Sequence, residues 1–450
     1  MRCVLKPFFC VKWMTLGGLN TSPGDNMAPY YRITIPALTI LCVALPAQAE
    51  FPELELSPRV IGEEVVQPSY PNSNAIAFDV GEASLYPALS VQVGSNDNLF
   101  AEVDETGATD STQLTLAPRF DYIATGAKQT VWLGYLGEYG QHADASQADY
   151  QDHRLSLISH TAFDSRRRLD VEASVAQSHQ SIGSGRTTEF SAVEIDALSE
   201  VDTFRISKIS AAFSFGNPAV KGELVGGLGG GSIAFISNEA DTAQYDRDFS
   251  IVWSKLYYRL SPRMRVVGSL AHRSFDYDGP YVSDGRERDS TTNTVSAGVV
   301  REISDLWYGR VDLRNRSQDF DDPTLEDNDG VLIDAKLFWL WKRYSRFELG
   351  LAEREFVSVL GPGVAKFRSV SLTWRHDWND RLSSVVKLES VERDESDESL
   401  NSDYSQSGVE LRFAPRRWLR VLGGYRKGAV GRLRGDADQT EIYFGAEANI

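Results

Sequence analysis

The chain is poor in cysteine. Its 450 residues include only three, Cys3, Cys10 and Cys42, and all of them lie within the first fifty residues. If that stretch is removed after synthesis, the remaining chain can form neither a disulfide framework nor a thiolate metal site. Such a chain crosses an oxidising compartment without mispairing of thiols.

Long apolar runs are also missing. The run from Ile33 to Leu45 spans about thirteen residues, whereas a helix needs ~20 residues to cross a bilayer core. Arg32 supplies a positive charge before this run, and the small-x-small motif Ala47-Gln48-Ala49 follows it. This arrangement is typical of a cleavable export signal, and a membrane anchor is the alternative.

The predicted export signal begins at Met27, just upstream of the apolar run. We therefore assign residues 27–49 to the signal peptide and expect cleavage after Ala49. Residues 1–26 are then a mis-assigned start or an N-terminal extension that has no folded role.

Positive charge is scarce as well. The chain has 46 Lys and Arg residues against 63 Asp and Glu residues, which gives a net charge of −17. Nucleic acid is not expected as a partner, because phosphate binding requires a basic surface.

Catalytic and metal-binding motifs are missing too. The six histidines are scattered with no H-x-x-x-H spacing: His142, His153, His160, His179, His272 and His376. The run Gly226–Gly231 lacks the Gly-Lys-Ser/Thr of a phosphate-binding loop, so close packing within a strand is expected there. The acidic segment from Asp319 to Asp329 lacks the EF-hand pattern. We therefore expect a solvated external loop, and the alternative is that its carboxylates share divalent cations with lipopolysaccharide phosphates. No enzyme activity, metal or cofactor is predicted.

The chain is rich in two-residue alternation. Within residues 329–341, Val331 and Ile333 share one face, while Asp334 and Lys336 take the other. The same pattern recurs in three further segments, residues 306–316, 345–356 and 366–377. Such alternation places apolar and polar side chains on opposite faces of a β-strand. The mean hydropathy of −0.29 excludes a multi-helix inner-membrane protein, but it suits strands that are apolar on one face only.

The turns between these segments fall into two alternating classes. Short turns rich in Gly, Pro, Asn, Asp and Ser occur near residues 124–128, 164–167, 217–219, 261–263, 303–305, 342–345, 378–380 and 415–417. Longer polar loops lie near residues 95–111, 141–150, 181–202, 237–245, 276–290, 318–328, 394–403 and 428–438. This alternation is typical of an outer-membrane barrel, in which the short turns face the periplasm.

The segments predict an all-β fold, a transmembrane antiparallel up-and-down β-barrel of about 18 strands (roughly 16–18) with both termini in the periplasm. The barrel is expected at residues 84–450, after a proline-containing periplasmic lead-in at residues 50–83. The last segment, from Thr440 to Ile450, alternates to the end of the chain. It resembles the signal that the barrel-assembly machinery reads, although that signal usually ends in an aromatic residue.

The polar faces of these strands are expected to line the barrel interior. By strand phase, the lumen-facing charged residues are Arg310, Asp312, Arg314, Arg316, Lys336, Arg346, Glu348, Arg354, Arg375, Lys387, Glu389, Arg412, Arg420 and Arg426. Charged side chains cost little in a water-filled lumen and determine which solutes pass. Two interpretations remain open: the arginines guide an anionic or hydroxylated solute, or paired charges merely solvate the interior.

A family resemblance begins where the predicted barrel begins. The stretch from Leu85 to Phe100 reads as a strand that runs into an Asp-Asn-aromatic loop, and Leu116-Ala117-Pro118-Arg119-Phe120 and Leu133-Gly134-Tyr135 follow it. This arrangement resembles the putative β-barrel porin 2 family, outer-membrane proteins often encoded with exopolysaccharide or capsule synthesis genes. The resemblance implies a large outer-membrane barrel with a role in polysaccharide export or the biofilm matrix. It supplies no catalytic or ligand-binding residues.

These features together predict a porin-like protein of the bacterial outer membrane that assists export or passage of exopolysaccharide or related anionic or hydroxylated solutes. Two alternatives stay open: a structural or assembly barrel plugged by its own loops, and an outer-membrane enzyme that acts on lipid or glycan. The expected partners are outer-membrane lipid and lipopolysaccharide, the barrel-assembly machinery and polysaccharide export machinery.

Overall fold

The computed structural model describes residues 76–103, 108–187, 190–217, 221–281, 285–358, 363–396, 400–432 and 435–449. The predicted N-terminal extension, the predicted signal peptide and most of the predicted lead-in lie outside the described residues, and so does Ile450.

Eighteen antiparallel strands form one closed sheet. In chain order these strands are β2 (Ala83–Asn96), β3 (Ser111–Thr125), β4 (Gln129–His142), β5 (Tyr150–Ala162), β6 (Arg167–Gln180), β7 (Asp202–Asn217), β8 (Gly222–Phe235), β9 (Arg247–Ser261), β10 (Met264–Tyr277), β11 (Ser290–Ser304), β12 (Trp307–Phe320), β13 (Asn328–Lys342), β14 (Ser345–Val357), β15 (Val364–Asp377), β16 (Leu382–Asp394), β17 (Ser402–Arg416), β18 (Leu419–Arg432) and β19 (Gly435–Asn449). Each strand pairs with its neighbours in sequence, and β19 pairs with β2, which closes the barrel. The prediction of an up-and-down barrel of about 18 strands is confirmed.

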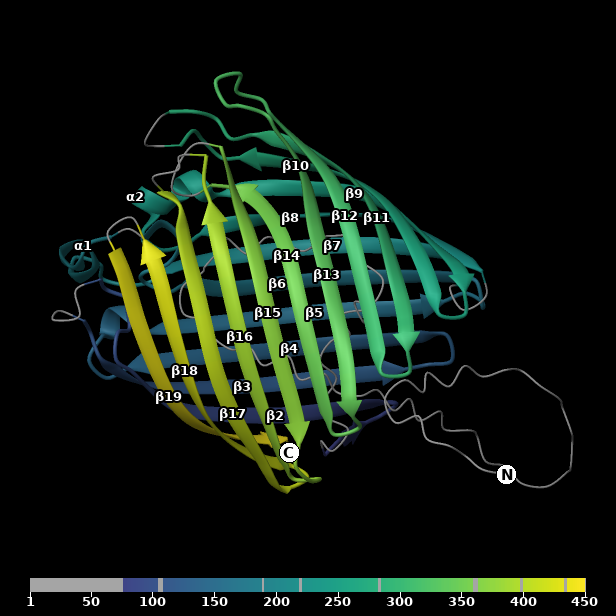
Figure 1. Ribbon diagram of the computed structural model, residues 1–450, viewed down its shortest axis with the longest axis horizontal. Helices are drawn as coiled ribbons and strands as arrows, with labels where there is room; N and C mark the ends of the chain where they lie inside the picture. The colour runs from purple at the N-terminus through teal and green to yellow at the C-terminus, as the bar shows by residue number, and fades with distance from the viewer. Residues whose placement is uncertain are drawn as a thin grey trace, which may run out of the picture.

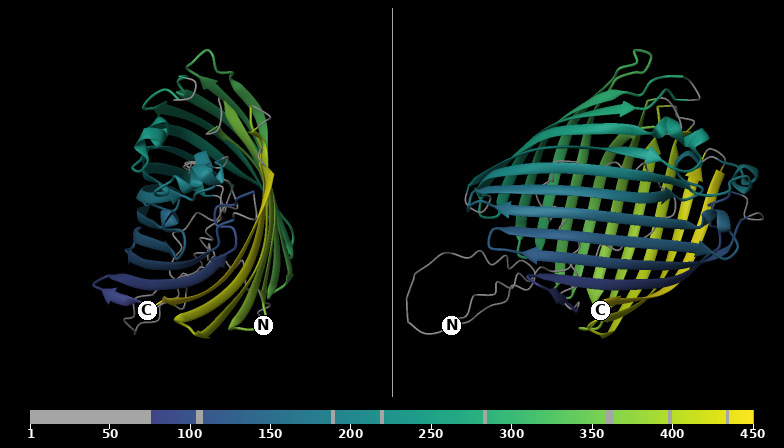
Figure 2. Two further views of the ribbon diagram at one scale, coloured as in Figure 1. Left: turned by 90° about the vertical axis from the view of Figure 1, so that its left-hand side faces the viewer. Right: turned by 180° about the vertical axis from the view of Figure 1, so that it is seen from behind.

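Loops and short helices gather at one end of the barrel, as Figures 1 and 2 show. The helices α1 (Ala192–Asp196) and α2 (Glu239–Thr242) both lie at this end, which we call the loop end. The first residue of β2 and the last residue of β19 lie at the other end, the short-turn end, where Asn449 N donates to Trp418 O. No helix among the described residues is long and apolar enough to cross a membrane.

All eight predicted short turns separate consecutive strands at the short-turn end. The predicted long loops are also present, with two corrections. The connection between β14 and β15, which runs from residue 358 to 363, was not predicted as a long loop. The long loop predicted at 428–438 was wrong, because β18 extends to Arg432 and β19 begins at Gly435. Glycines and charges suggested a loop there, but backbone pairing continues to the last pair, Arg432↔Gly435.

A short additional strand, β1 (Phe78–Val80), precedes the barrel. It pairs with the first residues of β2, from Val80↔Ala83 to Phe78↔Leu85, and Gly81 between them has a φ of 67°. The last register partner of β19 on β2 is Ala88, so β1 pairs with the part of β2 that β19 does not reach. The sequence analysis assigned residues 50–83 to a periplasmic lead-in, and the structure shows that residues 78–80 of this segment pair with the first barrel strand.

The two faces of the barrel wall differ as the alternation predicts. On β12, Val311 and Leu313 are 45% and 49% exposed, whereas Asp312 between them is 1% exposed. In a barrel, the apolar residues with exposed side chains form the face that contacts lipid, and the alternate residues face the lumen.

An aromatic row lies on the outer face near the short-turn end. The rings of Trp307, Trp339 and Phe347 stack in sequence with centroid separations of 5.1 Å, and Trp374 follows at 6.0 Å. Aromatic rings at this position are typical of the girdle that a membrane barrel places at a lipid headgroup boundary.

The glycine run in β8 serves close packing. A Cβ at Gly227 would lie 2.5 Å from the Trp253 ring, and a Cβ at Gly231 would lie 1.9 Å from the backbone oxygen of Ser207. A side chain at either position would therefore displace its neighbour. The interpretation of Gly226–Gly231 as a packing element within a strand is confirmed.

Candidate functional site

The structure places the fourteen predicted lumen residues on strands β12 to β18, at positions that alternate with exposed apolar residues. Their backbone register brings them into a continuous surface on one wall of the barrel. Contact of these residues with a solute stays a prediction. Their charge interactions divide them into three sets.

The first set is a buried arginine network on β12, β13 and β14. Asp334 accepts hydrogen bonds from Arg310 Nη2 at 3.1 Å, Arg314 Nη2 at 3.4 Å and Arg354 Nη1 at 3.3 Å. Asp312 accepts from Arg314 Nε at 2.8 Å. The side chains of Arg310 and Asp334 are each 2% exposed. The alternation placed Asp334 on the polar face, but nothing in the sequence indicated that three arginines share it.

Arg316 adds to this network through a carboxylate that the strand phase does not predict. Its Nη1 donates to Glu355 O at 2.8 Å and lies 3.4 Å from Glu355 Oε2. Simple alternation from Leu351 places Glu355 on the outer face. The register of β13 with β14 ends at Asp334↔Ala352, however, so the two strands separate beyond that point. Glu353 Oε2 then accepts from the backbone N–H of Ile333 at 3.1 Å, and the carboxylates occupy this seam.

The second set consists of ion pairs on β17, β18 and β19. Arg420 Nη1 lies 3.0 Å from Glu447 Oε2, Arg426 Nη1 lies 2.8 Å from Glu441 Oε2, and Arg412 pairs with Glu410. The hydroxyl of Tyr443 also donates to Glu410 at 2.8 Å. The carboxylate partners were not among the predicted lumen residues, although the terminal alternation placed Glu441 and Glu447 on the polar face.

The third set lacks close partners. Arg346 and Arg375 are direct cross-strand neighbours on β14 and β15. Among the described residues, neither has an ion pair within 4.0 Å or a side-chain hydrogen bond. The same holds for Lys387 and Glu389 on β16. Glu348 makes a longer contact of 3.7 Å with Lys336. Both arginines are partly exposed, so solvent or a solute reaches them.

The loop end of the lumen is narrowed by loops that fold inward. In the β2–β3 loop, Phe100 belongs to a buried apolar cluster with Tyr150 and Ile182, while Ala101 belongs to another with Phe367 and Tyr404 from the lumenal faces of β15 and β17. Gln439 Nε2 donates to Asn98 O at 2.6 Å, which ties the same loop to β19. This loop therefore joins the wall formed by β15 to β19 with the β4–β5 and β6–β7 loops.

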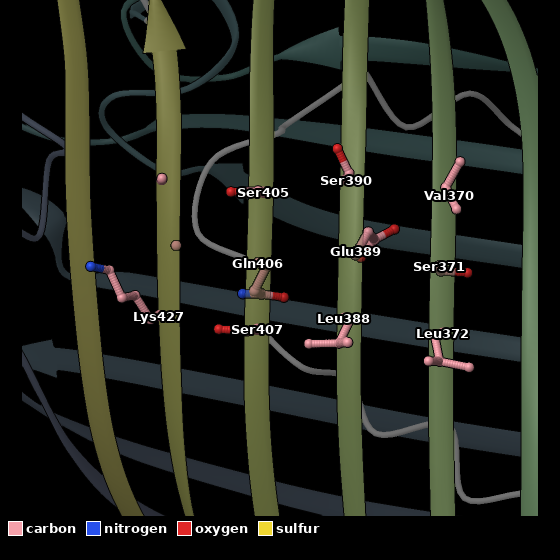
Figure 3. A pocket seen from close by; sticks show the side chains of 12 residues that line it. Val370, Ser371, Leu372, Leu388, Glu389, Ser390, Ser405, Gln406, Ser407 and Lys427 are labelled. Atoms are coloured by element: carbon pink, nitrogen blue, oxygen red, sulfur yellow. The ribbon is translucent and has the colours of Figure 1, made fainter.

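A depression on the wall formed by β15 to β18 is separate from the lumenal arginines (Figure 3). Its outward-phase lining includes Val370, Leu388, Ser407 and Lys427, and Lys427 Nζ pairs with Asp438 at 2.9 Å. The register row Ser371, Glu389 and Gln406 contributes from the lumenal phase.

The histidines form pairs rather than clusters. His179 Nδ1 lies 3.0 Å from Asp152 Oδ1, and His160 Nδ1 lies 2.5 Å from Asp170 Oδ1. No serine hydroxyl bonds to either imidazole within the described ranges. The described residues also contain no group of three or more His, Cys, Asp or Glu side chains arranged to hold a metal ion. In the acidic loop, Asp322 accepts from the Thr324 backbone at 2.8 Å, so its carboxylate stabilises the turn.

Comparison with solved structures finds outer-membrane porins. The outer membrane protein opdK from Pseudomonas aeruginosa is 11% identical with a TM-score of 0.45, and the match covers 81% of this chain and 99% of that chain. OccAB4 from Acinetobacter baumannii is 11% identical with a TM-score of 0.46, over 84% of this chain and 100% of that chain. A BenF-like porin from Pseudomonas fluorescens Pf-5 is 8% identical with a TM-score of 0.46, and the match covers 81% of this chain and 99% of that chain. Such low identities concern the fold alone.

Family membership rests on the sequence itself. No curated protein matches the chain significantly. The profile of the putative beta-barrel porin 2 family matches residues 71–448, which is nearly the whole of the described barrel and includes the three stretches that carry the resemblance. Proteins of a porin family are channels rather than enzymes. The chain thus belongs to the putative beta-barrel porin 2 family and is a porin-like β-barrel of the outer-membrane type.

Proposed function

We propose that this protein is a channel in the bacterial outer membrane that passes anionic or hydroxylated solutes, such as exopolysaccharide or its fragments. The observation that carries the proposal is the wall of the closed barrel, which is apolar outside and charged inside. A lumen lined by charges favours polar solutes, and guanidinium groups match carboxylates in shape and charge. We expect no covalent chemistry and no cofactor.

The orientation follows from general barrel topology. Short turns of outer-membrane barrels face the periplasm and longer loops face outward, so the short-turn end is assigned to the periplasm together with both termini of the mature chain. Insertion would depend on the barrel-assembly machinery. Polysaccharide export machinery would deliver the solute at the short-turn end, and lipopolysaccharide would surround the loop end.

A plugged structural barrel is the second candidate, and the inward-folded β2–β3 loop favours it. Phe100 of this loop clusters with residues of β5 and the β6–β7 loop, while Ala101 clusters with residues of β15 to β19. Such packing narrows the loop end of the lumen. It also suits a β2–β3 loop that moves aside only when a partner binds.

An outer-membrane hydrolase is the third candidate, and one feature of the outer face bears on it. His272 Nδ1 lies 2.8 Å from Asn293 Oδ1, and Ser274 shares their face of β10. No hydrogen bond joins Ser274 to His272 among the described residues, so the contact between nucleophile and base that such catalysis needs is missing. We therefore propose a channel and not an enzyme.

Single-channel conductance of the purified protein in a planar bilayer tests the proposal. Stable ohmic steps that acidic glycans block are expected. Absence of conductance from protein that still shows the heat-modifiable migration of a folded barrel would contradict the channel and favour a plugged scaffold. Conductance that appears only after deletion of residues 98–102 would identify the β2–β3 loop as the plug.

A further inference from the structure

The cross-strand pair Arg346 and Arg375 is an unusual arrangement within the lumen. Side chains at directly opposite positions have Cβ atoms roughly 4.5–5.5 Å apart, and like charges there are destabilising. Elsewhere on this wall, arginines are neutralised by carboxylates, as in the pairs Arg420–Glu447 and Arg426–Glu441. The opposed pair lacks such neutralisation by direct contact, so it is suited to an anion from outside the protein.

The nearest carboxylates are already engaged. Glu348 lies two residues from Arg346 on β14, but its closest cation is Lys336 at 3.7 Å. Glu410 accepts hydrogen bonds from Arg412 and from the Tyr443 hydroxyl. The third set (Lys336, Arg346, Glu348, Arg375, Lys387 and Glu389) together with the neighbouring pair Arg412–Glu410 comprises five cationic side chains and three carboxylates, so two positive charges remain. This local excess contrasts with the net charge of −17 for the whole chain.

An aromatic surface adjoins the arginine pair. Phe338 on β13 is the register partner of Glu348, so Arg346 is its diagonal neighbour across the two strands. Diagonal neighbours are roughly 7–8 Å apart, within reach of long and aromatic side chains. The Phe338 ring lies 5.7 Å from the Tyr308 ring, and both are only partly buried. Such a face provides an apolar platform for one side of a sugar ring.

The pair also lies at a place that a solute must pass. Arg346 is the second residue of β14 and Arg375 is close to the end of β15, so both lie at the short-turn end of the lumen. The loops that narrow the barrel lie at the opposite end. A solute that enters from the short-turn end meets the arginine pair before it meets the loops.

We propose that Arg346, Arg375 and Phe338 form a subsite for an acidic sugar, a uronate unit of a glycan chain. The two guanidinium groups bind the carboxylate and the phenyl ring contacts the sugar face. Arginine forks suit carboxylates because they donate two parallel hydrogen bonds. This inference rests on the proposed channel function and specifies the solute class at one position within it.

The test is the block of single-channel current by trigalacturonate, with the full chain expressed and recovered from membranes. The substitutions R346Q and R375Q are each expected to raise the half-blocking concentration roughly tenfold, since a hydrogen bond to a charged group is worth about that factor or more. F338L is expected to weaken block by trigalacturonate but not by inorganic phosphate. Maltotriose, which is neutral, is expected to block poorly in every variant.

The matched control is the double substitution R420Q/E447Q. It removes one lumenal arginine at the short-turn end together with its own partner, and block by trigalacturonate is expected to change less than twofold. Heat-modifiable migration confirms that each variant is folded. Normal conductance with undiminished block in R346Q and R375Q would overturn the subsite and leave the channel function intact.

Two further outcomes separate the other possibilities. If inorganic phosphate blocks as well as trigalacturonate and F338L has no effect, the assignment to an acidic sugar is overturned, because the pair then binds any anion. If the wild-type protein does not conduct, the channel function fails, and calorimetric titration of the folded protein with trigalacturonate decides the subsite separately. Binding that disappears in R346Q and R375Q supports the subsite in that case, and equal binding in all variants overturns it.

Discussion

The lumenal wall carries arginines in two contrasting environments. In the buried network, Arg310, Arg314 and Arg354 converge on the single carboxylate of Asp334. At the short-turn end, Arg346 and Arg375 oppose each other with no ion pair to a described carboxylate. The same residue type therefore stabilises the wall in one region and is left available for a solute in the other. The difference lies in whether a carboxylate comes within hydrogen-bond distance, as Asp334 does diagonally from Arg310 and Arg314. A guanidinium group is always charged and needs a counter-charge.

Removal of the shared carboxylate should have the largest effect on stability. D334N leaves three arginines without their common partner, and loss of one member of a buried ion pair costs about 3–5 kcal/mol. We expect the temperature at which the barrel loses its folded migration in detergent to fall clearly. D312N is the matched control, because Asp312 accepts from only one of these arginines, and its effect should be smaller. Equal losses in the two variants would contradict the shared role of Asp334.

A substitution where β13 and β14 separate should have an intermediate effect on stability. E355Q weakens the contact with Arg316, and a hydrogen bond to a charged group is worth about 1.5–3 kcal/mol. Urea unfolding in micelles measures the loss. Glu392 provides the control, since its side chain is 63% exposed and lies 3.6 Å from Arg368 on the outer face. E392Q should be nearly neutral, because exposed ion pairs contribute little. A neutral E355Q would show that the backbone carbonyl of Glu355 and the side chain of Gln318 hold Arg316 without the carboxylate.

Substitution of an opposed arginine should affect the preference for anions rather than stability. R375Q removes a like-charge contact, so stability should stay unchanged or rise by up to about 1 kcal/mol. At the same time, the preference of the channel for anions, measured by the reversal potential in a salt gradient, should decrease. A clear loss of stability in R375Q would show that the pair is part of the structural network, and the comparison between the two regions would fail.

The exposed turn at Asp164 should show the smallest effect, and it depends on pH. The backbone N–H of Arg166, together with the Arg167 side chain, holds the pKa of Asp164 below its usual range. A carboxyl with a lowered pKa in the folded state stabilises the protein above its unfolded pKa, and this contribution is lost as pH falls through the folded pKa. D164N should therefore be slightly less stable than wild type near neutral pH, and the gap should close in acid. A gap that persists after full protonation of Asp164 in acid would assign the effect to turn geometry instead.

Much of the fold was predictable from the sequence because a strand has a strict period of two. The alternation in residues 329–341 predicted the outward Val331 and the lumenal Asp334, and the eight short turns were located from their turn residues. The error at 428–438 has a physical reason. Gly428 and Gly431 lower strand propensity, but backbone pairing with both neighbours outweighs that preference.

The sequence predicted which charged residues face the lumen, but it did not predict which of them form ion pairs. Strand phase identifies which arginines alternate with lipid-facing residues, but it treats Arg314 and Arg375 alike. The partners Asp334 and Glu447 come from neighbouring strands, and Glu355 lies on the face that simple alternation assigns to lipid. A sequence contains no direct record of cross-strand register, so paired and unpaired arginines look the same within it.

The sequence by itself determined the approximate strand number, the two faces of the wall and the positions of the short turns, because these depend on local periodicity and turn chemistry. The tertiary structure alone decided which arginines are neutralised, where β13 and β14 separate and how the β2–β3 loop packs across the opening. Those features depend on which side chains closure of the barrel brings within a few ångströms of each other. Local preference does not encode such distances, and only the register of the closed sheet does.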